Sequence, residues 1–231
     1  MQYSTTCIDN FFDDPMSVVK LANKQKYEPN PKNLSPGMRS APLHEINHSL
    51  FLHVCQKYLL NHHTKEEIPN ISYVADARFQ IVNTRYDKGF VHSDYPYLHT
   101  LIIYLSPLVS PESGTSLYKL KDSTATIPHD YINKKREYYK RFISNKKLTP
   151  KENEYFKNSL ETNNNLFQET VHFKNIFNRA IGFDSDVWHA AGSFNKNVNQ
   201  DRLTLIIFFK DILSSHTGLQ RCLSFPHTVF D

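Results

Sequence analysis

The chain has 231 residues, of which 39% are hydrophobic and 13% aromatic, and its formal net charge is +4. This length and composition are typical of one folded globular domain and exclude a disordered tail. The small positive charge permits a polyanionic partner but does not indicate one.

Cysteine content and apolar runs indicate the compartment. Cys7, Cys55 and Cys222 lie far apart and form no C-x-x-C pair, so neither a disulfide framework nor a thiolate zinc site is indicated. The first residues lack the basic and apolar regions of a secretory signal, and no apolar run approaches the ~18 residues that span a bilayer. We therefore expect a soluble cytoplasmic protein with no membrane partner; the pattern does not indicate an oligomeric state.

Residues 1–70 are expected to form a helical support. Asp13 or Asp14 can cap a helix that begins near Pro15, and an apolar stripe follows. After a loop rich in Pro and Asn, residues 48–63 show a second helical pattern.

From residue 75 the pattern changes to short β-branched or aromatic segments that are separated by turn residues. The same pattern resumes at residue 171. We predict barrel strands in residues 75–120 and 171–213, in a mainly β fold with flanking helices. A two-sheet barrel or sandwich of the jelly-roll kind fits this order of strands, within a single domain that spans residues 1–231.

Residues 121–170 interrupt the strands with a polar, strongly charged segment that is expected to be a helical insertion and a lid on the substrate side. Its basic residues alternate with aromatic ones, and the residues of both kinds are Lys134, Lys135, Arg136, Tyr138, Tyr139, Lys140, Arg141, Phe142, Lys146, Lys147 and Lys151. Such a stripe can bind nucleic acid. The favoured interpretation is a solvated helix whose aromatic side chains pack inward, which makes nucleic acid an unexpected partner.

Two residues of a predicted strand, His92 and Asp94, point to the same face because strand side chains alternate. They could be a structural hydrogen-bonded pair. Together with His189, 95 residues after Asp94, they also have the order H-x-D … H of a facial triad, which holds Fe(II) and leaves positions open for other ligands. The pattern alone is weak, because the chain has 12 histidines.

A further inward charge is expected near the C-terminus. Arg202 begins the apolar run DRLTLIIFF, and Thr204 shares its face. A buried guanidinium needs an anion, and an arginine beside a hydroxyl suits a carboxylate. The alternative is a solvent-facing Arg202 in a salt bridge with Asp201 or Asp184.

These elements, with others in the same order, resemble the Fe(II)/2-oxoglutarate-dependent oxygenases, and most closely their prolyl-4-hydroxylase-like branch. The matching segments are Tyr86–Gly89, Thr100–Leu105, Ser113–Tyr118, Asn178–Phe183, His189–Gly192 and Arg202–Thr204. The N-terminal part is similar to that of small, often phage-associated members. The resemblance implies a double-stranded β-helix, a jelly-roll or cupin-like barrel; the segment between Tyr118 and His172 is longer than is common in the family.

The resemblance also implies roles for individual residues. His92, Asp94 and His189 would bind iron, and Arg202 would pair with the distal carboxylate of 2-oxoglutarate, helped by Tyr104 and Thr204. No catalytic residue beyond the metal triad is implied. Weaker substrate-side candidates, for each of which packing is the favoured role, are Tyr86, His99 and Trp188.

The implied activity is that of a dioxygenase that uses Fe(II), 2-oxoglutarate and O2. It would hydroxylate a protein side chain or a small molecule and release succinate and CO2. Nucleobase demethylation is less favoured, because the last strand lacks the second arginine of that branch. The alternative function is a non-catalytic jelly-roll protein that retains the fold for binding or assembly.

Overall fold

A computed structural model describes residues 3–29, 35–83, 88–108, 110–122, 124, 127, 130–143, 149–193 and 201–214. Its strands are β1 (Thr6–Ile8), β2 (Glu28–Pro29), β3 (Met38–Arg39), β4 (Ser72–Val82), β5 (His99–Tyr104), β6 (Thr115–Leu120), β7 (Phe167–Phe173), β8 (Ala180–Asp184), β9 (Trp188–Ala191) and β10 (Arg202–Leu213). Its α-helices are α1 (Pro15–Asn23), α2 (Leu43–Ile46), α3 (His48–Leu59), α4 (Tyr131–Ile143) and α5 (Pro150–Asn164), and two 3-10 turns are η1 (Ile68–Asn70) and η2 (Pro111–Ser113).

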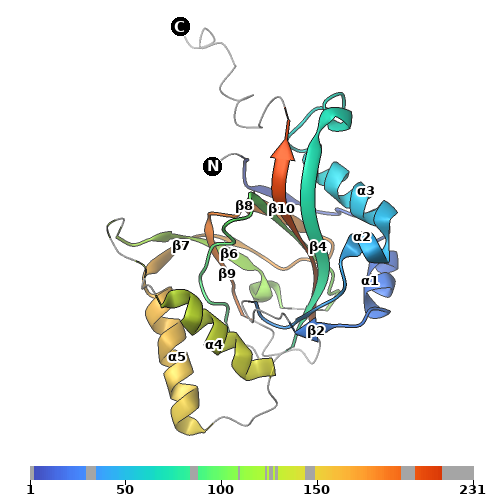
Figure 1. Ribbon diagram of the computed structural model, residues 1–231. Coiled ribbons are helices and arrows are strands. Elements are labelled where there is room, and N and C mark those ends of the chain that lie inside the picture. Colours follow the sequence, from blue (N-terminus) through green and yellow to red (C-terminus); the bar gives the residue numbers. More distant parts are fainter. Residues whose placement is uncertain are drawn as a thin grey trace, which may run out of the picture.

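The strands form two antiparallel sheets (Figure 1). The large sheet has the order β1-β8-β5-β10-β4-β3-β2, and the small sheet has the order β7-β6-β9. The chain passes back and forth between the sheets, from β5 to β6 and β7, then to β8, β9 and β10. This alternation is typical of a jelly roll. The expected mainly β fold with helices is therefore confirmed, although no hydrogen-bonded ladder among the described residues closes the two sheets into a barrel.

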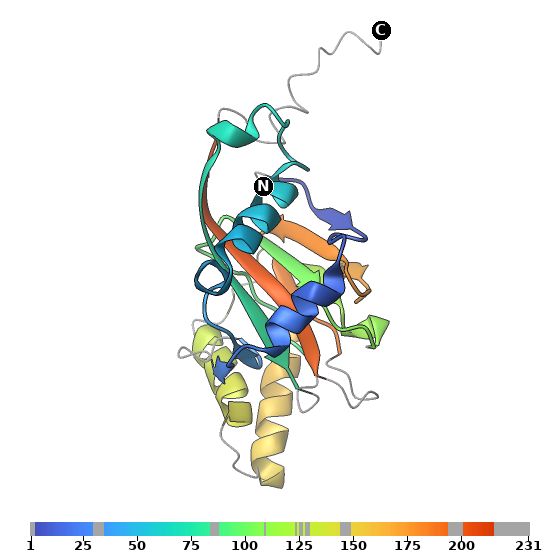
Figure 2. The same cartoon turned by 90° about the vertical axis from the view of Figure 1, so that its right-hand side faces the viewer.

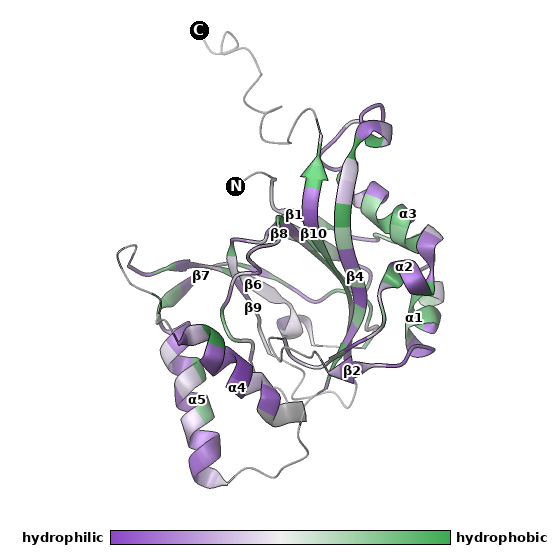
Figure 3. Ribbon diagram, viewed as in Figure 1, coloured by the Kyte–Doolittle hydropathy of each residue, from purple (hydrophilic) through white to green (hydrophobic). Residues whose placement is uncertain are grey.

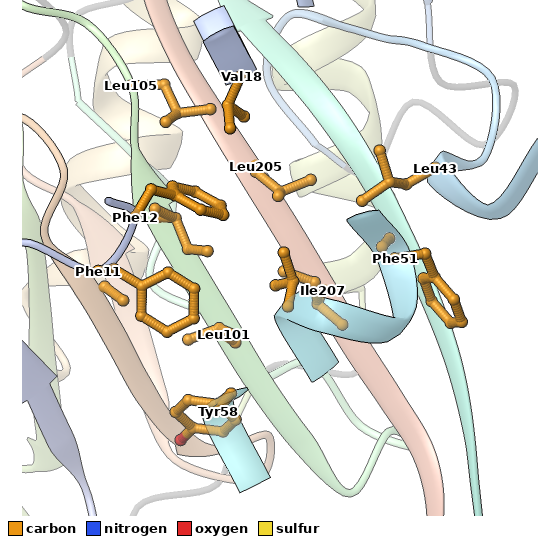
Figure 4. Close-up of a cluster of buried hydrophobic side chains, with 14 of the residues drawn as sticks. Phe11, Phe12, Val18, Leu43, Phe51, Tyr58, Leu101, Leu105, Leu205 and Ile207 are labelled. Atoms are coloured by element: carbon orange, nitrogen blue, oxygen red, sulfur yellow. The ribbon is translucent and has the colours of Figure 1, made fainter. Parts of the chain in front are cut away.

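Strand β10 lies at the centre of the large sheet, between β5 and β4. Because its side chains alternate, one face presents Leu205 and Ile207 to the helices. These residues belong to a hydrophobic core that also contains residues of α1, α2 and α3 (Figure 4). The three helices lie across this face of the large sheet (Figure 2), so the face that remains turns toward the small sheet.

The N-terminal helices form much as expected. The Asp14 side chain accepts a hydrogen bond from Ser17 N at 3.1 Å, and Pro15 is the first residue of α1. The second helix, α3, ends at Leu59 rather than at His63. None of the helices in the described part of the chain is long and apolar enough to cross a membrane.

The insertion contains α4 and α5, which are mainly hydrophilic (Figure 3). Thr149 and Glu152 form a capping box at the start of α5. Tyr138 and Tyr139 of α4 are buried and pack against Phe90 and Val82. The favoured interpretation, in which these aromatic side chains pack inward, is correct for both tyrosines, and a nucleic acid could not stack on them.

Gly182 of β8 allows α3 to pack closely on the large sheet. A Cβ at Gly182 would overlap the Tyr58 hydroxyl, which hydrogen-bonds with His99 Nε2 at 2.6 Å and with Thr6 Oγ1 at 3.1 Å.

We predict that Gly182→Ala lowers the free energy of unfolding by about 1–3 kcal/mol, because overpacking displaces the helix or the strand. Urea denaturation measures the change. Val171→Ala, at an exposed site on β7, is the control and should change stability by less than about 0.5 kcal/mol. Equal stability of Gly182→Ala and the native protein would contradict the close packing.

Candidate metal centre

His92 and His189 are brought together by backbone pairing. Residues 88–92 run beside β9, where His92 N donates to His189 O at 3.0 Å and His189 N donates to His92 O at 2.8 Å. Residues paired in this way point their side chains to the same face of a sheet. The two imidazole rings consequently lie with their centroids 4.4 Å apart.

Each imidazole is oriented by a carbonyl oxygen. His92 Nδ1 lies 2.6 Å from Phe90 O, and His189 Nδ1 lies 2.9 Å from Val187 O. Because a carbonyl oxygen can only accept, both Nδ1 atoms donate, and each neutral ring keeps its lone pair on Nε2. The Nε2 atoms of His92 and His189 lie 3.5 Å and 3.1 Å from the two oxygens of Asp94.

Residues on the large-sheet side of the site hold Asp94 in place. The Asp94 backbone N donates to Ser185 O at 2.7 Å, and Thr100 Oγ1 donates to Asp94 Oδ2 at 3.0 Å. Thr100 Oγ1 is also 2.7 Å from Ser185 Oγ. Since the Thr100 proton is given to Asp94, the Ser185 hydroxyl donates to Thr100. Thr100 of β5 and Ser185, which follows β8, therefore position the Asp94 carboxylate.

The protonation states suit a metal ion. Burial, the nearby Lys135 charge and His189 lower the pKa of His92 to about 4. Burial by itself raises the pKa of Asp94, but His189 and His92 hold that pKa well below its usual value. At neutral pH His92 is therefore a neutral ligand and Asp94 a charged one.

The three side chains form a group that could hold a metal ion, with one ligand atom from each residue and all three atoms within 4.8 Å of one another. Two imidazoles and one carboxylate are the donor set of a facial triad. Three ligands on one face leave other coordination positions for exchangeable ligands. The residues that the sequence suggested as a triad thus lie together in the structure.

Arg202, Tyr104 and Thr204 lie close to one another on neighbouring strands. The Arg202 side chain is 5% exposed, which excludes the alternative of a solvent-facing arginine. Its Cζ lies 5.3 Å from the centre of the Tyr104 ring, and Tyr104 pairs with Thr204 across β5 and β10. Burial lowers the pKa of Arg202, and Tyr104 counteracts that effect. The Tyr104 hydroxyl donates to Thr115 Oγ1 at 2.9 Å.

A cavity of about 280 Å³ joins the triad to Arg202, whereas Tyr104 and Thr204 are not among the residues that line it. It is lined by the three triad residues, Arg202, Thr100 and Thr115, and by two cations that the sequence analysis did not assign to the site, Arg39 and Lys135. Lys135 could have been found from helical spacing, because Tyr138 and Tyr139 follow it at i+3 and i+4 on the face that was expected to pack inward. No sequence signal identifies Arg39, which reaches the site by the pairing of β3 with β4.

Neither His99 nor Trp188 lines the cavity, and both have the packing role that was favoured for them. His99 lies on the opposite face of β5 from Thr100, where it is 1% exposed and binds Asp184 Oδ1 at 3.0 Å. Trp188 alternates with His189 along β9 and packs against Phe167 and Tyr131. Tyr86 lies outside the described residues.

The fold is similar to that of several solved structures. One is HygX from Streptomyces hygroscopicus with nickel and 2-oxoglutarate bound, at 13% identity and a TM-score of 0.50 over 90% of this chain and 83% of that one. Another is SnoK, a non-heme alpha-ketoglutarate-dependent carbocyclase from nogalamycin biosynthesis, at 11% identity and a TM-score of 0.51 over 91% and 80%. At such identities the likeness shows a shared fold.

A prolyl-4-hydroxylase from Pseudomonas putida has a TM-score of only 0.42, at 11% identity over 90% of this chain and 92% of that one, so it does not bear on the branch. No curated protein matches the sequence. A sequence-family model does match, over residues 2–209; its description is "Family of unknown function (DUF6445)". Because this match covers most of the chain, the protein belongs to the DUF6445 family.

Proposed function

We propose that the protein is an Fe(II)- and 2-oxoglutarate-dependent dioxygenase that acts as one domain. The observation that carries this proposal is the convergence of His92, Asp94 and His189, with both Nε2 atoms turned toward the carboxylate. The reaction would hydroxylate a small molecule or a protein side chain with release of succinate and CO2. The order of the matching segments along the chain supports a place in the prolyl-4-hydroxylase-like branch.

His92, Asp94 and His189 would hold the metal. The carbonyl partners of both Nδ1 atoms and the Thr100 hydroxyl on Asp94 orient the ligands in advance, and such outer partners raise metal affinity. Bound Fe(II) and 2-oxoglutarate supply the oxidising chemistry. The protein would position these groups and the substrate and keep water from the site.

Arg202 and Thr204 would hold 2-oxoglutarate. Thr204 Oγ1 is buried and has no hydrogen-bond partner among the described residues, although it lies two residues from Arg202 on the same face of β10. A buried hydroxyl without a partner is costly. A carboxylate bound to the Arg202 guanidinium would accept a proton from this hydroxyl as well. Tyr104 would position the guanidinium through its ring and through its hydroxyl oxygen, which can accept from Arg202 while its proton goes to Thr115.

The insertion would limit the access of water. Lys135 and Tyr139 of α4 line the cavity, and the Tyr139 hydroxyl accepts a hydrogen bond from Phe90 N at 3.0 Å. This contact attaches α4 to Phe90, which lies two residues before the ligand His92. A binding or assembly protein needs neither a converging ligand set nor a buried arginine beside it, which favours the enzyme over that alternative.

The first prediction for this function concerns the metal and 2-oxoglutarate. Anaerobic titration with Fe(II) and 2-oxoglutarate should produce the weak visible charge-transfer band of the chelate. His189→Ala should abolish the band, because the metal loses a ligand. Arg202→Met should weaken 2-oxoglutarate binding by about 10- to 100-fold, as expected for a lost hydrogen-bonded charge.

His172→Ala is the matched control, because His172 lies on the small sheet but binds Ser116 Oγ at 2.8 Å rather than the triad. It should keep the band. If the folded native protein gives no band at saturating Fe(II), the oxygenase proposal is wrong, and the non-catalytic binding alternative takes its place.

A second prediction concerns Thr100. Thr100→Val keeps the shape of the side chain but removes the hydroxyl that donates to Asp94. Metal affinity should fall by about 10- to 100-fold, the usual cost of losing such an outer partner. Competition with a metal-binding dye measures the affinity. Thr170→Val, where the hydroxyl binds Leu117 O, should leave it unchanged; equal losses in both variants would show that Thr100 does not orient the ligand.

A further inference from the structure

Two cations of the cavity have no role in the proposed binding of metal and 2-oxoglutarate. Lys135, from α4, is 6% exposed, and Arg39, from β3, has a buried Nε without a hydrogen-bond partner in the described part of the chain. Both side chains line the cavity with the triad. Neither forms a salt bridge with a described residue. A buried cation without a counterion is costly, so these positions call for an anion.

Aromatic packing holds Arg39 on the cavity wall. Its Cζ lies 5.3 Å from the centre of the Phe208 ring. That ring stacks on Tyr97 at 4.8 Å. The guanidinium is therefore positioned by cation–π contact. The nearby Asp76 already pairs with Arg78 at 3.0 Å.

Arg39 and Lys135 act on each other and on Asp94. Burial lowers the pKa of Lys135 to about 7; the charge of Asp94 opposes this shift, and the charge of Arg39 adds to it. Burial also lowers the pKa of Arg39, which Asp94 again opposes. The two cations thus repel each other and share one carboxylate.

The Asp94 carboxylate cannot balance Arg39 and Lys135 once the site holds the metal and 2-oxoglutarate. On the proposed function, the site then contains two kinds of positive group, the metal dication and Arg202. Their formal charges cancel those of Asp94 and of the two carboxylates of 2-oxoglutarate. The charge of Arg39, and that of Lys135 when it is protonated, then remain without balance in the cavity. A bound anion would remove this cost and the repulsion between the two cations.

We propose that the substrate carries a carboxylate or phosphate group that binds between Arg39 and Lys135. This inference rests on the proposed function and names the substrate class of the same site. The cavity of about 280 Å³ is at the small end of the roughly 300–1,000 Å³ of ligand sites. The substrate is therefore a small acid, or a larger molecule of which only the acidic part enters.

The test uses the full chain with Fe(II) and 2-oxoglutarate under anaerobic conditions. Lys135→Met should raise the melting temperature, because it replaces a buried, unbalanced charge with an apolar side chain of similar length. The matched control is Lys134→Met on the same helix. Lys134 is only partly buried and pairs with Asp130 at 3.0 Å, so its replacement should not raise the melting temperature.

Acetate and inorganic phosphate then serve as probes, with acetamide as the neutral counterpart of acetate. At least one anion should raise the melting temperature of the native protein more than acetamide does. That advantage should disappear in Lys135→Met and Arg39→Met and persist in Lys134→Met. Fluorescence of Trp188, the sole tryptophan, gives an independent readout, because it contacts Tyr131 of α4. The two anions distinguish a carboxylate from a phosphate site.

The outcomes separate this inference from the proposed function. A lower melting temperature for Lys135→Met, or anion effects no larger than that of acetamide, would overturn the inference even if the charge-transfer band forms. If the charge-transfer band does not form but the anion effects still depend on Lys135 and Arg39, the anion site is supported and the proposed oxygenase function is rejected.

Discussion

The two backbone hydrogen bonds between His92 and His189 are the constraint on which the site depends. They join a segment that precedes β5 to a strand that follows β8. Antiparallel pairing at this point places both imidazoles on one face, and the carbonyl groups of Phe90 and Val187 then set their rotation. A shift of one residue in this pairing would turn one imidazole out of the site, so the register between the His92 segment, which is not part of a named strand, and β9 determines the donor set.

The rest of the structure supports this pairing from two directions. Thr100 and Ser185 of the large-sheet side hold the carboxylate of Asp94. On its other edge, the His92 segment has no neighbouring strand among the described residues; there Asn164 binds Val91 N and Gly89 O, at 2.9 Å and 3.0 Å. Exposed strand edges must be covered, and here α5 covers this one. The insertion is thus part of the wall of the site.

Charge distribution separates the cavity into two parts. Arg202 lies on β10 beside the Thr204 hydroxyl, which has no hydrogen-bond partner in the part of the chain that the structure describes. Arg39 and Lys135 come from β3 and α4. The His92 segment, β9 and β10 provide the groups proposed for the metal and 2-oxoglutarate, whereas β3, near one edge of the large sheet, and α4 provide the cations proposed for the substrate. Loops and insertions added to a rigid scaffold are where specificity usually resides.

The sequence by itself determined the strand-rich segments, the first helix and the candidate ligands, because alternation and capping are local properties of the chain. It also favoured an inward-facing Arg202, since the strand that this residue begins is too apolar to lie on the surface. It did not place Arg39 and Lys135 in the cavity. Those positions depend on which face of a strand or helix meets another element, and only packing between distant segments, such as β3 against β4 and α4 against residues 88–92, decides that.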